Sequence, residues 1–344
     1  MKIWKYSNNK FFLKIEDDIP LIGHIAFGII DRGTNLLQIR ATSFCALSCI
    51  FCSVDAGPRS RNRMTEYMID LDYLLEWIRY VIKLKSVNDI QIHLDAVGDP
   101  FTYPYLVELV RELSKIPVVK TVSIETHGAL LSQRLLDALD DAKLSRLNLS
   151  IDALDKNMAK YLADTKWYDV EKIKDFAKYV AQSLNMDIII APVWIPGIND
   201  DEIPRIIEFA LKIGAGKRWP PLGIQKYEVH KYGRKVKGVR ELSWYAFYEK
   251  LREWEKEFGV KLVLSPKDFN IIKTKRLPIP FRRFQTIKVK VIGPGWLHNQ
   301  WLGIAGERII TIVGVNDKEI PVGKIIKVKI LRNKDNIYVG ELKI

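Results

Sequence analysis

Cysteine is scarce in this chain of 344 residues, which has three: Cys45, Cys49 and Cys52, all within the run CALSCIFC. No cysteine is left elsewhere for a disulfide, which indicates a reducing compartment. No stretch of 18 or more apolar residues could span a membrane. The run MKIWKYSNNKFFLKIEDD mixes aromatic and charged residues without a continuous apolar core, so we expect no signal peptide. These absences predict a cytoplasmic protein with no membrane partner.

The spacing of the three cysteines predicts a shared ligand. Soft thiolates select iron-sulfur clusters, zinc or copper. A cubane [4Fe-4S] cluster has four irons, so three cysteines leave one iron open to substrate or cofactor. A structural zinc site would need a fourth ligand. Zinc therefore stays open as an alternative at this point.

The cysteine run resembles the signature of the radical SAM enzymes, Cys-x3-Cys-x2-Cys with an aromatic residue, here Phe51, before the third cysteine. It follows the strand-like run LLQIRAT at 36–42, and the resemblance extends over roughly residues 36–280. It implies that Cys45, Cys49 and Cys52 hold a [4Fe-4S] cluster whose open iron binds S-adenosyl-L-methionine. It also implies a 5'-deoxyadenosyl radical and an external one-electron donor such as ferredoxin or flavodoxin. Because no further cysteine exists, a second cluster and a methyl-carrying cysteine are not expected.

Strand-like and helix-like segments alternate from residue 36, and six such units predict an α/β fold, a partial (β/α)6 barrel of the radical SAM type. We expect strands at 36–42, 90–96, 121–125, 146–151, 186–193 and 222–228, and helices at 71–85, 105–113, 130–142, 169–184, 202–213 and 242–258. Five short strand-like runs after residue 285 predict a small all-β barrel that resembles the TRAM domain, an OB-like module of some RNA-modifying enzymes. The expected domains are an extended N-terminal segment (1–35), the partial barrel (36–272), a basic linker (273–284) and the TRAM-like barrel (285–344).

Positive charge is concentrated at the end of the chain. The net charge is +13, with 54 Lys and Arg against 41 Asp and Glu. Such an excess favours a polyanionic partner, although a Lys-rich thermostable protein would have it too. We expect RNA contacts, with transfer RNA as the expected class, from three arginines after the cysteines and from the linker and first barrel strand: Arg59, Arg61, Arg63, Lys273, Lys275, Arg276, Arg282, Arg283, Lys288 and Lys290. A solvated basic loop is the alternative for the arginines.

Further cofactor contacts are expected at the carboxyl ends of the strands. The resemblance implies that the VGDP turn, with Gly98 and Asp99, offers acceptors to the ammonium of S-adenosyl-L-methionine, and that Ile195 packs against adenine. Ser150 and Asp152 share one face of their strand and could meet the ribose or the carboxylate. Tyr227 could stack on adenine. The alternatives are an ordinary turn at VGDP, a capping role for Asp152 and core packing of Tyr227. For His127, we favour a loop histidine over a proton donor.

The sequence therefore predicts a radical SAM enzyme that modifies a nucleoside in RNA, possibly as a transferase. One alternative is a radical SAM enzyme that acts on a small metabolite or lipid. Another is a non-catalytic RNA-binding protein with a structural metal site. The residues do not identify a catalytic side chain.

Overall fold

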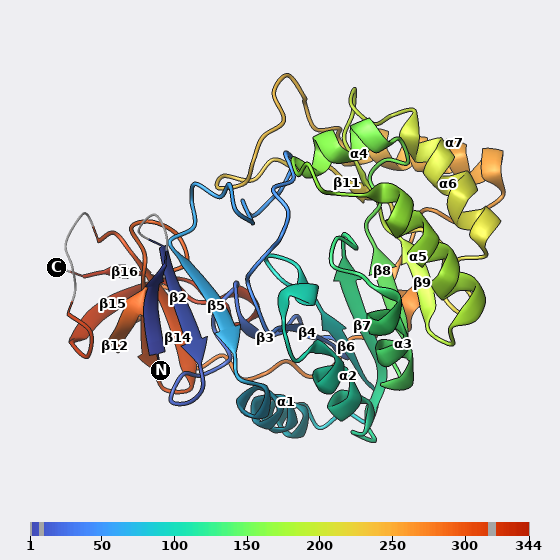
Figure 1. The fold of residues 1–344 in the computed structure, drawn as a ribbon. Helices are drawn as coiled ribbons and strands as arrows, with labels where there is room; N and C mark the ends of the chain where they lie inside the picture. The colour runs from blue at the N-terminus through green and yellow to red at the C-terminus, as the bar shows by residue number, and fades with distance from the viewer. Residues whose placement is uncertain (1, 7–9, 316–320, 344) are drawn as a thin grey trace. The chain divides into compact units, whose positions relative to one another are not determined.

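The computed structural model describes residues 2–6, 10–315 and 321–343. Parts of two predicted domains, residues 1 and 7–9 of the N-terminal segment and 316–320 and 344 of the C-terminal barrel, lie outside the described residues. The chain divides into two compact units (Figure 1). The first unit contains Met1–Phe44, Arg61–Tyr105 and Lys273–Ile344, and the second contains Cys45–Ser60 and Leu106–Ile272.

The second unit contains three neighbouring strands of a parallel sheet, a separate pair of short strands and six α-helices. Strands β7 (Val119–Thr126), β8 (Arg146–Leu149) and β9 (Asp187–Ile190) pair in that order. Their apolar side chains, such as Ile124, Leu147 and Ile188, are completely buried, as expected for a parallel sheet covered by helices. Three of the helices, α2 (Leu106–Ser114), α5 (Val170–Ser183) and α6 (Glu202–Ile213), pack against the strands (Figure 1). The other helices are α3 (Gln133–Asp141), α4 (Lys156–Ala163) and α7 (Trp244–Phe258).

The predicted sixth strand, 222–228, is much shorter than expected. Its strand β11 (Gln225–Lys226) pairs in parallel with β10 (Val193–Trp194), and Leu222 makes one parallel bridge with Ile190. On the partner side Pro192 separates β9 from β10, and proline cannot donate the backbone hydrogen bond that a continuous ladder requires.

The first unit contains the beginning of the strand-helix alternation. Strand β4 (Leu36–Arg40) pairs in parallel with β6 (Ile90–Leu94), and helix α1 (Leu71–Lys85) connects them along the chain. The side chain of Asp70 caps α1 by accepting from the backbone N–H groups of Asp72 and Tyr73, which satisfies two donors that the helix itself cannot use.

The predicted N-terminal extension contains three strands. Strand β3 (Gly28–Asp31) pairs antiparallel with β4. Strand β2 (Lys10–Ile15) lies between β1 (Lys2–Tyr6) and β5 (Thr65–Ile69), antiparallel to the first and parallel to the second. The described residues of this segment, 2–6 and 10–35, thus belong to the folded structure of the first unit.

The C-terminal barrel is confirmed. Strands β12 (Thr286–Pro294), β13 (Trp301–Ala305), β14 (Arg308–Val313), β15 (Ile325–Arg332) and β16 (Val339–Leu342) close in the order β12-β13-β14-β16-β15. Only β14 and β16 among these neighbours pair in parallel. This is the strand order of an OB-type barrel. Val289, Ile310, Ile312 and Val328 fill its interior.

Candidate cluster and cofactor site

The three cysteines lie in one loop of the second unit. Cys49 is buried, and Cys45 and Cys52 are half-buried. The Sγ of Cys45 accepts a hydrogen bond from the backbone N–H of Leu47 at 3.4 Å, and the Sγ of Cys52 accepts one from that of Ala56 at 3.2 Å. Such N–H···S bonds stabilise negative sulfur and tune the potential of a cluster.

Deprotonation of the three cysteines at this site requires a positive partner. Burial raises the pKa of the Cys49 thiol well above its usual value, and the neighbouring Cys45 and Cys52 raise it further. Three thiolates gathered in this way repel one another, and iron ions remove that cost by binding the deprotonated form. The donor set therefore fits a [4Fe-4S] cluster held by Cys45, Cys49 and Cys52.

Helix α4 supports the cysteine loop from one side. The backbone N–H groups of Ser48 and Ile50 donate to the carbonyls of Ala163 and Leu162 at the end of the helix, at 3.2 and 2.9 Å. The last carbonyls of a helix have no partner within it, so the loop satisfies them. The sequence analysis did not predict α4, although Asp155 caps it through the N–H groups of Asn157 and Met158.

Arg234 supports the cysteine loop through four groups. Its guanidinium donates to the carbonyl of Cys49 at 3.0 Å, to the carbonyl of Ala56, and to the carboxylate of Asp55 at 2.9 Å. Its backbone N–H donates to the carbonyl of Cys52 at 2.8 Å. Asp55 is 3 % exposed, so this ion pair is shielded from solvent. Sequence reasoning missed Arg234 because nothing distinguishes it from the neighbouring Lys231, Lys235 and Lys237.

A small cavity beside Cys49 contains a histidine and a carboxylate. His127, at the end of β7, and Asp152, after β8, both line it. The Nδ1 of His127 is 3.4 Å from a carboxylate oxygen of Asp152, and the ring of Phe51 meets the imidazole edge-on at 6.3 Å. The second oxygen of Asp152 accepts from the backbone N–H of Val193 at 2.8 Å. The structure thus brings Phe51, His127 and Asp152 together with Cys49.

Three other predicted cofactor residues are interior side chains of the second unit. Ser150 is 3 % exposed, Ile195 0 % and Tyr227 1 %. The hydroxyl of Tyr227 accepts from the backbone N–H of Val236 at 3.0 Å. A side chain with almost no exposed surface has none with which to contact adenine. The structure therefore does not support the predicted adenine contacts of Ile195 and Tyr227.

Gly98 and Asp99 lie in the first unit, beside the residue that precedes Cys45. A Cβ atom on Gly98 would lie 1.9 Å from the carbonyl oxygen of Phe44, and the N–H of Asp99 donates to that oxygen at 2.7 Å. The side chain of Asp99 accepts from the backbone N–H of Phe101 at 2.9 Å. Glycine is thus required for close backbone approach, and the contact of Asp99 with the cofactor stays a prediction.

Arg63 is not an RNA contact in this structure, because its side chain is 0 % exposed. It pairs with Glu66 at 3.2 Å, donates to the carbonyls of Ser43 (2.8 Å) and Val97, and lies over the ring of Trp296, 5.2 Å from the centroid. A buried arginine with these partners cannot reach a phosphate. We therefore remove it from the predicted RNA-binding set.

The other predicted RNA contacts lie at the surface. Arg59 pairs with Asp164, the residue that ends α4, and Arg61 is exposed. The linker and β12 residues are all exposed: Lys273, Lys275, Arg276, Arg282, Arg283, Lys288 and Lys290.

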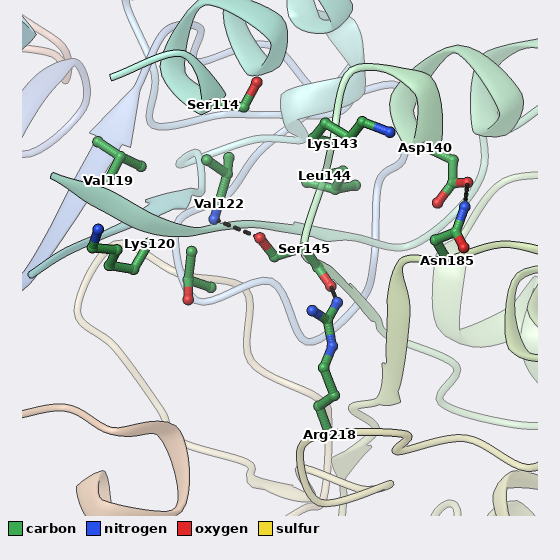
Figure 2. A pocket seen from close by; sticks show the side chains of 11 residues that line it. Ser114, Val119, Lys120, Val122, Asp140, Lys143, Leu144, Ser145, Asn185 and Arg218 are labelled. Atoms are coloured by element: carbon green, nitrogen blue, oxygen red, sulfur yellow. Dashed lines mark hydrogen bonds between the residues drawn. The ribbon is translucent and has the colours of Figure 1, made fainter. Parts of the chain in front are cut away.

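Another cavity of the second unit lies at the opposite end of the strands from His127 and Asp152. Figure 2 shows this cavity of about 320 Å³, lined by Val119 and Val122 at the start of β7, by Ser145 before β8 and by Asn185 before β9. Arg218 donates to the carbonyl of Ser145 at 2.9 Å. Function in barrels of this kind lies at the carboxyl ends of the strands, so this cavity is not the cofactor site.

The chain belongs to the radical SAM superfamily. The family model "Radical SAM superfamily" matches residues 39–210. Uncharacterized protein MJ0103 of Methanocaldococcus jannaschii is 42% identical over 346 residues, which is 95% of this chain and 80% of that protein. The GTP 3',8-cyclase of Chlorobaculum tepidum is 27% identical over 59% of this chain and 57% of its own length, so the chain spans little more than half of that relative. Streptococcus suis SuiB has a TM-score of 0.49 at 16% identity, over 66% of this chain and 47% of SuiB.

Family membership defines the protein as an enzyme that uses a [4Fe-4S] cluster and S-adenosyl-L-methionine and needs an external electron donor. When bound, these cofactors supply one-electron chemistry that the amino acids lack. The chain's own groups hold the cysteine loop, through α4 and Arg234, and surround Cys49 with Phe51, His127 and Asp152. Among the described helices, none combines the length and apolar character needed to cross a bilayer.

Proposed function

We propose that the protein is a radical SAM enzyme that modifies a nucleoside in RNA, with transfer RNA as the substrate to test first. The observation that carries the proposal is the closed OB-type barrel preceded by an exposed basic linker with five Lys and Arg and no acidic residue. OB-type barrels bind oligonucleotides in many proteins, and clustered basic side chains attract phosphates. The radical generated from S-adenosyl-L-methionine would abstract a hydrogen atom from the target nucleoside, with ferredoxin or flavodoxin as electron donor.

A second candidate function is modification of a small nucleotide. Its support is the likeness to the GTP 3',8-cyclases, one of which, from Syntrophomonas wolfei, is 31% identical over 53% of this chain. GTP is also a polyanion, so the charge of the chain does not separate the two candidates. A cytoplasmic location stays a prediction for both.

The test uses full-length protein with its cluster, S-adenosyl-L-methionine and dithionite. We expect transfer RNA from a strain without this gene to stimulate release of 5'-deoxyadenosine and to gain a nucleoside of new mass. Transfer RNA from the wild-type strain, already modified, is the matched control and should stimulate less. Stimulation by GTP with no effect of either RNA would contradict the proposal and favour the second candidate.

A further inference from the structure

The face that OB-type barrels commonly use for oligonucleotides, strands two and three with the adjoining loops, is covered by the chain itself. In this barrel those strands are β13 and β14. The N–H of Ile309 on β14 donates to the carbonyl of Ile22, and that of Tyr338, in the loop before β16, to the carbonyl of Gly23, both at 2.9 Å. A Cβ on Gly23 would lie 2.3 Å from the carbonyl oxygen of Ile309. At this contact no room remains for an RNA strand.

The loop between β12 and β13 is occupied in the same way. The carbonyl of Trp296 accepts from the N–H of Met64 at 2.8 Å, and its ring carries the guanidinium of Arg63. Leu297 forms an antiparallel bridge with Arg63. An RNA-binding surface on this barrel must therefore use other strands.

Strands β12 and β15 carry a lysine ladder on their outward side. Lys288 lies directly opposite Lys327, Thr286 opposite Lys329, and Lys290 opposite Ile325. All six side chains are exposed, whereas the alternating Ile287, Val289, Val328 and Ile330 are buried. Like charges directly opposite each other on paired strands are destabilising. Within 10–315 and 321–343, no ion pair joins any of the four lysines to a carboxylate, although the register places Glu341 on β16 opposite Lys329. The repulsion that an anionic ligand would relieve is therefore that between Lys288 and Lys327.

An aromatic ring lies at one end of the ladder. Phe284 is 58 % exposed, and its backbone N–H donates to the carbonyl of Ile330 on β15 at 2.7 Å. The guanidinium of Arg283 lies 4.5 Å from the ring centroid and the Nζ of Lys329 5.5 Å from it. Arg283 is itself anchored to the carbonyl of Leu331 at 3.1 Å. The ring is thus held on the sheet, exposed, between two cations.

We propose that this surface, the β12–β15 strip (Phe284, Lys288, Lys290, Lys327 and Lys329), binds an unpaired segment of RNA. The proposal rests on the RNA substrate proposed above. Lysines two apart on a strand are about 7 Å apart, close to the separation of adjacent phosphates in an extended single strand. Exposed aromatic rings stack on unpaired bases, and cations along the strand bind the backbone. The strip therefore supplies one base platform and a row of phosphate contacts.

The test measures fluorescence anisotropy of a labelled single-stranded RNA of about 12 nucleotides on full-length holoprotein over a range of salt concentrations. We expect K288E/K327E to weaken binding at least about tenfold and to lower the salt slope by about 1.4 for the two lost contacts. The matched control K172E/K178E changes the same charge at exposed positions on α5 and should bind as the wild type does.

The ring is tested separately from the charge. We expect Phe284→Ala to weaken single-stranded RNA binding at least about fivefold, and Phe284→Tyr to change it less than about twofold, because stacking needs only an aromatic face. Binding of a duplex of the same sequence should be insensitive to Phe284→Ala, since paired bases cannot reach the ring.

The outcomes distinguish the strip from the RNA function. If the wild type binds RNA and transfer RNA stimulates turnover, but the strip variants bind like K172E/K178E, the strip is refuted and the RNA function stands. If the wild type binds no RNA, both fail. Phosphatidylserine vesicles are the third probe: binding to them through the strip, with no RNA binding, would overturn the proposal in favour of a membrane surface.

Discussion

Substitution of Arg63 tests the packing of the first unit. The sequence predicted that Arg63 contacts RNA, whereas the structure buries its side chain and pairs it with Glu66. Arg63→Met keeps much of the aliphatic volume but removes the charge. The carboxylate of Glu66 then remains in the interior, and the carbonyls of Ser43 and Val97 lose their donor. Breaking a buried pair by removing one partner costs about 3–5 kcal/mol. We expect a loss of stability in this range, measured by anaerobic urea unfolding.

The pH dependence identifies the cause. Burial raises the pKa of Glu66 above its usual 4.5, and Arg63 opposes that rise. Without Arg63 the folded-state pKa should rise further. A raised carboxyl pKa means that the folded state holds its proton more tightly, so the protonated group favours folding at low pH and this contribution is lost as pH rises through the folded pKa. The deficit of Arg63→Met should therefore be larger at about pH 8 than at about pH 5.

The second variant separates charge from packing. Glu66→Gln, added to Arg63→Met, removes the stranded charge and keeps an acceptor for the hydroxyl of Ser43, which donates to Glu66. We expect it to recover about 1–3 kcal/mol and to abolish the pH dependence. If Arg63→Met instead unfolds like the wild type and loses one phosphate contact in the salt dependence of RNA binding, the buried-pair reasoning is refuted and Arg63 returns to the RNA-binding set.

Three further predictions concern the cysteine loop and the barrel. Arg234→Met should lower the iron content and the paramagnetic signal of reconstituted protein, because it removes the guanidinium contacts that hold the loop; exposed Lys237→Met is the control, and equal iron content in both would contradict the role of Arg234. Gly98→Ala should cost about 2–5 kcal/mol in urea unfolding, since its Cβ meets the carbonyl of Phe44, and a stability equal to the wild type would contradict that contact. Lys327→Glu should raise the unfolding free energy by about 0.2–1 kcal/mol, because it turns a like-charge cross-strand pair with Lys288 into an attractive one, while it weakens RNA binding; a variant that is less stable would show that the two lysines do not repel.

Local sequence patterns correctly predicted those helices and strands whose bounds depend mainly on their own residues. Helices α1 and α6 begin and end where apolar spacing and end residues place them, at Leu71–Lys85 and Glu202–Ile213. Strand β5 was missed because it carries Glu66 on a buried side, where a charge breaks the expected alternation. The short helix α4 was missed because eight residues hold too few periodic positions to stand out.

The role of a side chain could be predicted from the sequence only where the residue type and its spacing indicate one kind of chemistry. The three clustered cysteines match the spacing of a family signature, so the cluster ligands could be predicted from the sequence through that resemblance. Arg59, Arg61 and Arg63 look equivalent in GPRSRNR, yet the fold buries only the last, because Trp296 and Glu66 meet it there. Arg234 gained its role in the same way, from carbonyls far away along the chain. Tertiary partners of this kind leave no local trace.

These contacts also decide how the RNA proposal should be tested. Removing residues 285–344 would take away Trp296, which covers Arg63, and Arg63 holds the carbonyl of Ser43, one residue before Phe44. Phe44 in turn is fixed by Gly98 and Asp99 immediately before the first cysteine. A truncated protein would lose activity through this series of contacts even if the barrel never touched RNA. Only substitutions on the exposed β12–β15 strip, such as K288E/K327E and Phe284→Ala, change the surface and leave that series intact.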